Sequence, residues 1–284
     1  MLKKIFFAAA LLLASELIAK PVVIASIAPV EYLAKAVGGD KIEVQSLAKG
    51  DVHSYEPKPN DMKAVAKARI FIAAGLEFEE AWIPRFKASA KNLVVVKSDA
   101  KIAKLKEERG EQAEHDEKHE AHADPHVWLN PMLAITMARN ISDALIDMDK
   151  ANKDFYLENF QKLMNDLLAF DESAKESLAG LKNRKFVVYH PAWGYFAAHY
   201  DLEQISIERN GKEPKIDEMA STVKMIKDEN IKVIFADPNR SQKSAQVLAS
   251  QTGAKVELLD PLGYNLLENL KIAVGAIKDA NSPK

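Results

Sequence analysis

Three histidines, His53, His126 and His190, are the side chains in this sequence best suited to binding a metal ion together. Imidazole nitrogens suit Zn²⁺, and three of them with one oxygen ligand would complete a tetrahedral shell. The chain contains no cysteine and no HExxH sequence, so it carries no local zinc motif. From spacing alone, each histidine could equally be a surface residue or a hydrogen-bonded residue with no metal.

The elements that would position these histidines follow a regular alternation. Short β-branched runs, each followed by a helical pattern, are typical of parallel strand-helix-strand units with helices on both sheet faces. The sequence therefore predicts an α/β fold. Predicted strands cover residues 22–26, 42–47, 69–73, 93–96, 186–189, 204–207, 232–236 and 255–258.

The histidines lie at or near predicted strand ends, where open parallel sheets bind their ligands. His53 lies in the loop after the strand 42–47, and His190 directly follows the apolar part of the strand 186–189. His126 precedes a helix that we expect to start at Asn130. Acidic residues occur in the same setting, because Asp237 and Asp260 each lie just past a strand end.

A long helix is predicted over residues 150–182, where apolar residues recur at spacings of mostly three and four. About 30 helical residues would extend about 45 Å, which is long for one compact lobe. The halves on either side share the same strand and helix pattern. We expect two similar α/β lobes, residues 20–149 and 183–284, joined by this helix, as the pattern on both sides of it indicates.

The first 19 residues resemble a secretory signal peptide: Lys3 and Lys4 precede an apolar run too short to span a bilayer. Because the chain has no cysteine, it has no N-terminal cysteine to carry a lipid. We therefore expect a soluble periplasmic protein. With 39 basic and 41 acidic residues, the chain lacks the basic excess of a nucleic-acid-binding protein.

Residues 107–124 are predicted to form a flexible loop, since they are highly charged and lack large apolar side chains. The loop contains His115, His119 and His122. They could capture metal weakly as an auxiliary site, or they could belong to a solvated insertion without a role in binding.

Several longer motifs surround the histidines and carry a family resemblance. The motif DVHSYEPKP covers residues 51–59, DPHVWLNP covers 124–131 and YHPAWGYF covers 189–196. Acidic motifs follow at 235–238 (FADP) and 259–263 (LDPLG). In this order the motifs resemble those of the metal-binding solute-binding proteins of ABC transporters, and most closely the ZnuA-like periplasmic zinc-binding proteins.

The resemblance implies two α/β lobes, a rigid connecting helix and a metal ion held between the lobes. It implies His53, His126 and His190 as ligands, with Asp260 as the fourth; Asp237 and Glu208 are the alternatives. Manganese-binding relatives generally place glutamate at the position of His190. Since imidazole suits zinc better than manganese, the histidine favours zinc.

We therefore expect a binding protein and not an enzyme: a monomer that captures zinc as its transported ligand and delivers it to a membrane permease. A manganese- or iron-binding protein of the same family is the main alternative. A zinc-dependent hydrolase and a surface adhesin are less favoured. Because the ligands must be deprotonated, we expect affinity to fall below about pH 6.5, the reference pKa of histidine.

Overall fold

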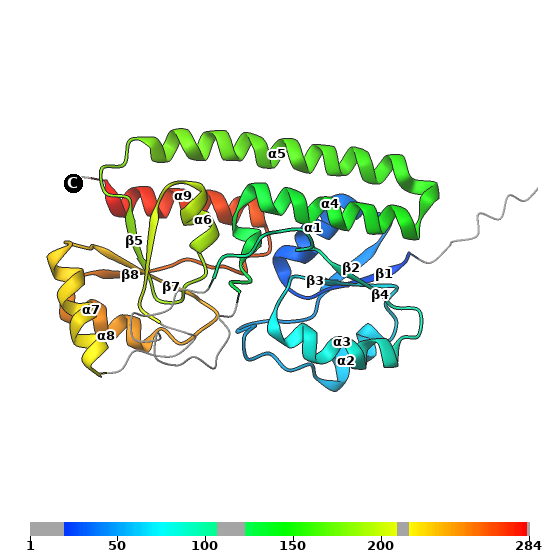
Figure 1. Cartoon of the computed structure of the whole chain (residues 1–284), viewed down its shortest axis with the longest axis horizontal. Helices are drawn as coiled ribbons and strands as arrows, with labels where there is room; N and C mark the ends of the chain where they lie inside the picture. The colour runs from blue at the N-terminus through cyan, green and yellow to red at the C-terminus, as the bar shows by residue number, and fades with distance from the viewer. Residues whose placement is uncertain (1–19, 107–122, 209–215, 283–284) are drawn as a thin grey trace, which may run out of the picture.

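The structure is a computed structural model that describes residues 20–106, 123–208 and 216–282 of the chain. It contains two four-stranded parallel sheets, with strand orders β2-β1-β3-β4 and β6-β5-β7-β8. The two orders are equivalent, since the first strand of each half pairs with the second and the third, and the fourth joins outside the third. The predicted fold of two similar α/β lobes is therefore confirmed (Figure 1).

The N-terminal lobe holds the first sheet. Its elements are β1 (Val22–Ala25), α1 (Ala28–Gly38), β2 (Glu43–Ser46), α2 (Pro59–Val65), β3 (Ile70–Ala73), α3 (Glu77–Ser89), β4 (Val94–Lys97), the short 3-10 helix η2 (Val127–Leu129) and α4 (Pro131–Met148). The central strand β3 is buried throughout, whereas the outer strand β4 is only partly covered.

The C-terminal lobe repeats this arrangement. Its elements are β5 (Lys185–Val188), α6 (Gly194–His199), β6 (Glu203–Ser206), α7 (Ile216–Asp228), β7 (Val233–Ala236), α8 (Lys243–Thr252), β8 (Lys255–Leu258) and α9 (Leu266–Asn281). Again the central strand β7 is buried throughout and the outer strand β8 is largely exposed.

The long helix α5 (Lys153–Ala179) has 27 residues and lies within the predicted range 150–182. A short 3-10 helix, η3 (Lys150–Asn152), precedes it. In Figure 1, α5 runs along both lobes, and it contacts α1 and α4 of the first and α9 of the second. The buried residues recur at helical spacing, so one continuous face joins the two lobes: Tyr156, Phe160, Leu163, Leu167, Phe170, Ala174 and Leu178. No helix in the described residues is long and apolar enough to cross a membrane.

The helix that follows His190, α6, begins only at Gly194. Proline disfavours the helical conformation of the residue before it, which keeps His190 out of the helix. His190 therefore remains at the carboxyl end of β5, where it can face a ligand.

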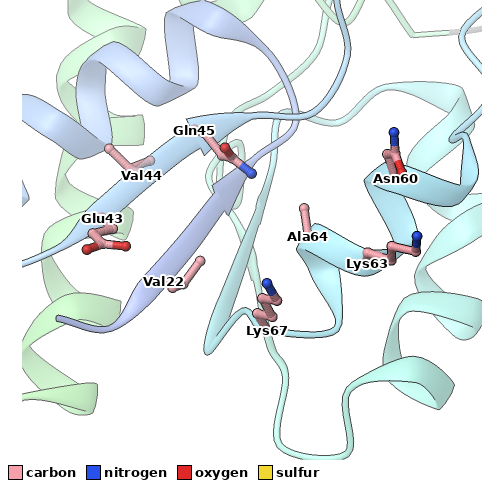
Figure 2. A pocket seen from close by; sticks show the side chains of 8 residues that line it. All are labelled: Val22, Glu43, Val44, Gln45, Asn60, Lys63, Ala64 and Lys67. Carbon is pink, nitrogen blue, oxygen red and sulfur yellow. The ribbon is translucent and has the colours of Figure 1, made fainter. Parts of the chain in front are cut away.

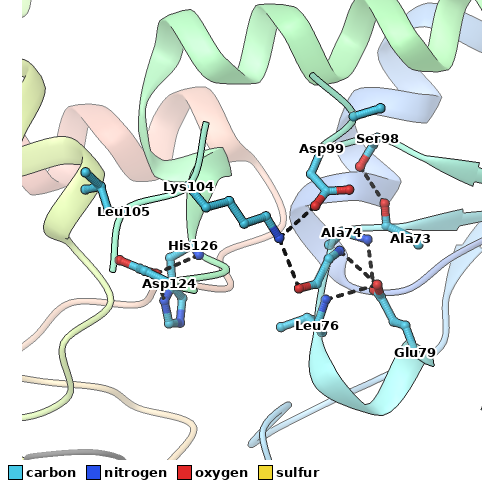
Figure 3. A network of polar contacts seen from close by, with 12 residues as sticks. Ala73, Ala74, Leu76, Glu79, Ser98, Asp99, Lys104, Leu105, Asp124 and His126 are labelled. Atoms are coloured by element: carbon cyan, nitrogen blue, oxygen red, sulfur yellow. Dashed lines mark hydrogen bonds and ion pairs between the residues drawn. The ribbon is translucent and has the colours of Figure 1, made fainter. Parts of the chain in front are cut away.

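A buried carboxylate shapes the turn after β3 in the N-terminal lobe. Glu79 accepts backbone N–H hydrogen bonds from Ala74 (2.8 Å), Gly75 (2.8 Å) and Leu76 (3.0 Å). On the other side of this turn, the Lys104 ammonium donates to the carbonyl oxygen of Gly75 at 3.3 Å and forms a 2.7 Å ion pair with Asp99 (Figure 3). The turn is thereby held rigidly on the same side of the lobe as the segment that leads to His126.

Candidate metal centre

The three predicted histidines come together at the junction of the lobes. One nitrogen atom from each of His53, His126 and His190 lies within 4.8 Å of the other two. His53 comes from the loop between β2 and α2, and His126 from the segment just before η2. His190 follows β5 in the other lobe, so both lobes contribute to the cluster. His126 and His190 are buried (3% and 6% exposed), whereas His53 is more open.

Two of the imidazoles have a ring nitrogen that forms no hydrogen bond within the described residues. The Nε2 atoms of His53 and His190 are buried and have no hydrogen-bond partner in the described residues. Burying a polar atom without a partner is costly, so most native proteins avoid it. Convergent nitrogens of this kind are suited to a cation that can accept their lone pairs.

The buried imidazoles are each oriented by a carboxylate. His126 Nδ1 lies 2.7 Å from Asp124 Oδ1, and the same oxygen accepts the backbone N–H of His126 at 2.9 Å (Figure 3). His190 Nδ1 lies 2.7 Å from Glu208 Oε2. A carboxylate at Nδ1 places the proton on that nitrogen and leaves Nε2 free to bind a metal.

The loop that carries His53 is ordered by its own side chains. Asp51 Oδ1 accepts the backbone N–H of His53 at 3.1 Å, and Asp51 Oδ2 accepts the hydroxyl of Ser54 at 3.2 Å. The hydroxyl of Tyr55 donates to Asp61 Oδ2 at 2.8 Å. These contacts connect the loop to the start of α2, so the chain around His53 does not depend on metal for its shape.

The environment keeps two of the imidazoles neutral. Burial, with smaller contributions from the nearby His126 and Arg240, lowers the pKa of His53 to about 4. Burial also lowers the pKa of His190 well below its usual value, with further contributions from His126 and His53. Neutral imidazoles have the lone pairs that a cation needs, so little proton competition is expected near neutral pH.

The predicted acidic ligands lie outside the group of histidine nitrogens. Among the described residues, no carboxylate belongs to the set of ligand atoms within 4.8 Å of one another. Asp260 Oδ1 accepts hydrogen bonds from Asn239 Nδ2 (2.7 Å) and from the backbone N–H of Leu262 (2.8 Å). Asp237 Oδ1 accepts from the backbone N–H of Asn239 at 2.7 Å, and Glu208 contacts His190 as described above.

Two buried tryptophans lie next to the centre. The ring of Trp128 lies 5.3 Å from that of His126, and its Nε1 donates to the carbonyl oxygen of Pro261 at 2.8 Å. This bond joins the two lobes. Trp193 is also buried and lines a small cavity of about 10 Å³ together with His190 and Pro261. The tryptophans therefore serve both as core residues and as an apolar wall of the site.

Sequence reasoning missed Arg240 as a member of the site. Its Nη2 donates to Glu208 Oε1 at 2.9 Å, and its Nη1 lies 3.0 Å from His190 Nδ1. The orienting role of Asp124 was also missed, although this residue stands within the motif around His126. An acid two residues before a candidate ligand was a usable signal, because metal-bound histidines commonly pair with a carboxylate. No sequence signal connected Arg240 with Glu208.

The auxiliary histidines His115, His119 and His122 lie outside the described residues. The two ends of that segment are described: Lys106 and Ala123 form an isolated antiparallel bridge, and Asp124 donates its N–H to Leu105 at 2.9 Å. The hydroxyl of Tyr195 in α6 donates to the carbonyl oxygen of Asp124 at 2.8 Å. The base of the segment is thus held close to His126 by both lobes.

His199 has a structural contact away from the centre. Its Nε2 lies 2.6 Å from Asp171 Oδ1 on α5, and Lys175 Nζ lies 2.7 Å from the other carboxylate oxygen. His199 is not part of the three-histidine group. It serves to connect α6 with the long helix.

A separate groove lies on the N-terminal lobe, with a volume of about 410 Å³ (Figure 2). It lies by Val22 and Glu43, the first residues of β1 and β2, and by Lys63 and Lys67. The strands' amino ends are opposite to the ends from which the histidine-bearing loops leave, so this groove is not part of the metal centre.

Comparison with known proteins places this architecture in a family. The sequence model of the family described as zinc-uptake complex component A, periplasmic, matches residues 23–280. The high-affinity zinc uptake system protein ZnuA of Bacillus subtilis (strain 168) is 30% identical over 279 residues, which cover 91% of this chain and 86% of that protein. The zinc-binding protein AdcA of Streptococcus pyogenes serotype M3 (strain ATCC BAA-595 / MGAS315) is 32% identical over 287 residues, but this chain spans only 54% of its length.

Solved structures give the same result. A crystal structure of ZnuA superposes with a TM-score of 0.85 at 35% identity, covering 93% of this chain and 100% of the other. A zinc-bound ZnuA mutant that lacks residues 138–173 in its own numbering gives a TM-score of 0.86 at 34% identity, covering 93% and 99%. The fold, the order of the motifs and the sequence match agree, and the chain belongs to the family of periplasmic zinc-uptake component A proteins.

Proposed function

We propose that this protein captures Zn²⁺ outside the cytoplasmic membrane and delivers it to the permease of an ABC-type importer. The observation that carries the proposal is the meeting of His53, His126 and His190 from two lobes, with ligand nitrogens within 4.8 Å of one another. Membership of the zinc-uptake family supports the same function.

The three imidazoles are the ligands that we assign to the ion. Each would bind through Nε2, because Asp124 and Glu208 occupy the Nδ1 side of His126 and His190. Neutral nitrogen ligands suit Zn²⁺, whereas Mn²⁺ prefers carboxylate and water oxygens as ligands. This ligand set is the reason for proposing zinc as the cargo before manganese or iron.

Asp260 is the residue that we propose for the fourth position. Its Oδ1 accepts two hydrogen bonds, from Asn239 and Leu262, and these bonds would aim the second oxygen while leaving it available. Since the carboxylate lies outside the histidine group, its loop must move toward the ion on loading. X-ray absorption of the zinc-loaded protein tests this: the wild type should show one more carboxylate oxygen than Asp260→Asn. Equal spectra would assign the fourth position to water, Asp237 or Glu208.

The site fits binding and release better than catalysis. A hydrolytic zinc centre needs an open position for water and a general base beside it. Here the carboxylates of Asp124 and Glu208 contact the imidazole ligands, and closure by Asp260 would leave no position for an activated water. A solute-binding role also agrees with the family to which the chain belongs.

The chain organisation suits a carrier that docks on a permease as a monomer. We assign residues 1–19 to a signal peptide, 20–149 and 183–284 to the lobes, and 150–182 to the connecting segment. Because α5 packs along both lobes, only small lobe displacements are expected on loading. Small-angle scattering with and without zinc should give nearly equal radii of gyration, and a large decrease on loading would contradict the rigid connection.

Competition titration of the metal-free protein tests the cargo. Zinc should displace manganese at equal free concentrations, and His190→Ala should abolish tight binding. His199→Ala is the matched control, because this histidine contacts Asp171 outside the cluster. Preferential binding of manganese, or an equal loss in the two variants, would contradict the assignment.

A further inference from the structure

We propose that Arg240 is a positioning residue of the metal centre, which fastens the His53 loop of one lobe to the His190–Glu208 pair of the other. This inference rests on the proposed function, since it concerns the same centre. It adds an interlobe connection at the metal centre.

Arg240 is held on the C-terminal lobe by a buried carboxylate. The residue lies in the loop between β7 and α8, and its Nη2 donates to Glu208 Oε1 at 2.9 Å. The side chain of Glu208 is only 4% exposed and that of Arg240 is 17% exposed. A carboxylate removed from water requires a charged or hydrogen-bonding partner, so Arg240 stabilises Glu208 in the position from which it orients His190.

The same guanidinium reaches toward the N-terminal lobe. Arg240 Nη1 lies 4.0 Å from Asp51 Oδ1, at the limit of an ion pair. Asp51 in turn accepts the backbone N–H of His53 at 3.1 Å. Arg240 thus stands between two carboxylates, one from each lobe, and each carboxylate orients a different histidine of the cluster.

The donor chemistry of these groups leaves one N–H of Arg240 for the N-terminal lobe. Nδ1 of His190 lies 2.7 Å from the Glu208 carboxylate, so it carries the proton and donates it to Glu208. A guanidinium can only donate, so the 3.0 Å contact between Nη1 and this nitrogen is not a hydrogen bond. Asp51 Oδ1, at 4.0 Å, is therefore the acceptor toward which Nη1 can turn.

Arg240 should therefore hold the His53 loop against the other lobe through Asp51. The consequence is slower release of the ion. Lysine could not replace arginine here, because a single ammonium lacks the planar fork that donates to two carboxylates at once.

The test uses the full mature chain with the variants Arg240→Gln, Arg240→Lys, Asp51→Asn and the double variant Arg240→Gln/Asp51→Asn. Zinc release is timed after adding excess chelator, and zinc affinity is measured by competition. We expect about 10- to 100-fold faster release for Arg240→Gln, the range typical of partners that orient metal ligands. Arg240→Lys should recover only part of this loss, and the double variant should release zinc no faster than the worse single variant.

The control is Arg139→Gln, which removes an exposed arginine from its ion pair with Asp143 on α4. It should leave release unchanged. Hydrogen exchange supplies a readout that a merely structural role would not affect: with zinc bound, the His53 and Ser54 amides should be more protected in the wild type than in Arg240→Gln. If Arg240→Gln does not fold, Arg240→Lys and Asp51→Asn decide the question by the same measurements.

Wild-type release rates in Arg240→Gln or Asp51→Asn, or additive effects in the double variant, would overturn the inference while leaving the zinc function intact. Failure of the wild type itself to bind zinc would instead overturn the proposed function. The two failures are thus distinguishable in one series of measurements.

Discussion

Nδ1 of His190 lies 2.7 Å from Oε2 of Glu208, although the two residues are 18 positions apart in the chain. The contact arises because β5 and β6 are adjacent parallel strands, with Val188 opposite Ser206. His190 and Glu208 each follow two residues after this pair, and both remain at the same end of the sheet. A histidine and its orienting carboxylate are thus supplied by neighbouring strands.

Substitution of Glu208 by glutamine should weaken zinc binding by about 10- to 100-fold, because the imidazole of His190 loses its charged orienting partner. The coordination number should stay the same, since we assign Glu208 to His190 and not to the ion. Competition titration measures the affinity, and X-ray absorption counts the ligands. Loss of one oxygen ligand in the variant would show instead that Glu208 binds the metal directly.

Substitution of His190 by alanine should weaken tight zinc binding far more than deletion of residues 111–123. His190 supplies one of the three converging nitrogens, whereas the deleted residues contain only the auxiliary histidines. Calorimetric titration of the two variants checks this difference. Equal losses would mean that the main site is not the histidine cluster.

Protonation of His53 should weaken zinc binding only as the pH approaches about 4. The pKa of His53 is lowered to about 4, so protons compete with the ion for this imidazole only at this lower range. Competition titration at several pH values measures the effect. If the part of this pH dependence that is lost in His53→Gln lies near pH 6.5, the unperturbed histidine value, the burial of His53 is contradicted.

The free energy of unfolding of the metal-free protein should also depend on pH through His53, over the range from about 6.5 to 4. Unfolded histidine binds protons below about pH 6.5, whereas folded His53 does not until about pH 4. Because the unfolded state then holds more protons, the free energy of unfolding should decrease as the pH drops from 6.5 to 4. Urea unfolding checks the trend, and replacing His53 by glutamine should reduce its slope.

Substitution of Trp128 by phenylalanine should lower the free energy of unfolding by about 1–3 kcal/mol, because the buried carbonyl oxygen of Pro261 loses its donor. Trp82→Phe is the control: Trp82 is only partly buried, and its ring stacks on the guanidinium of Arg85. Denaturant unfolding of both variants measures the difference. An equal or larger loss in the control would mean that the interlobe bond contributes little.

Periodicity in the sequence predicted most of the fold because the elements are regular and strongly patterned. The strand Lys255–Leu258 has the predicted bounds. The helix α4 begins at Pro131, and the side chain of Asn130 caps it, as the prediction of a helix start at Asn130 requires. The apolar pattern of residues 191–200 does not indicate where α6 begins, because it carries no information on how Pro191 restricts the residue before it.

The sequence by itself determined which histidines belong together, since each stands in a distinctive motif next to a strand or a helix start. Only the tertiary structure decided how they are supported. The pairing of β5 with β6 brings Glu208 to His190, and the packing of the lobes brings Arg240 within reach of Asp51. Such contacts depend on the distance between side chains that are remote in sequence, and no local periodicity or composition carries that information.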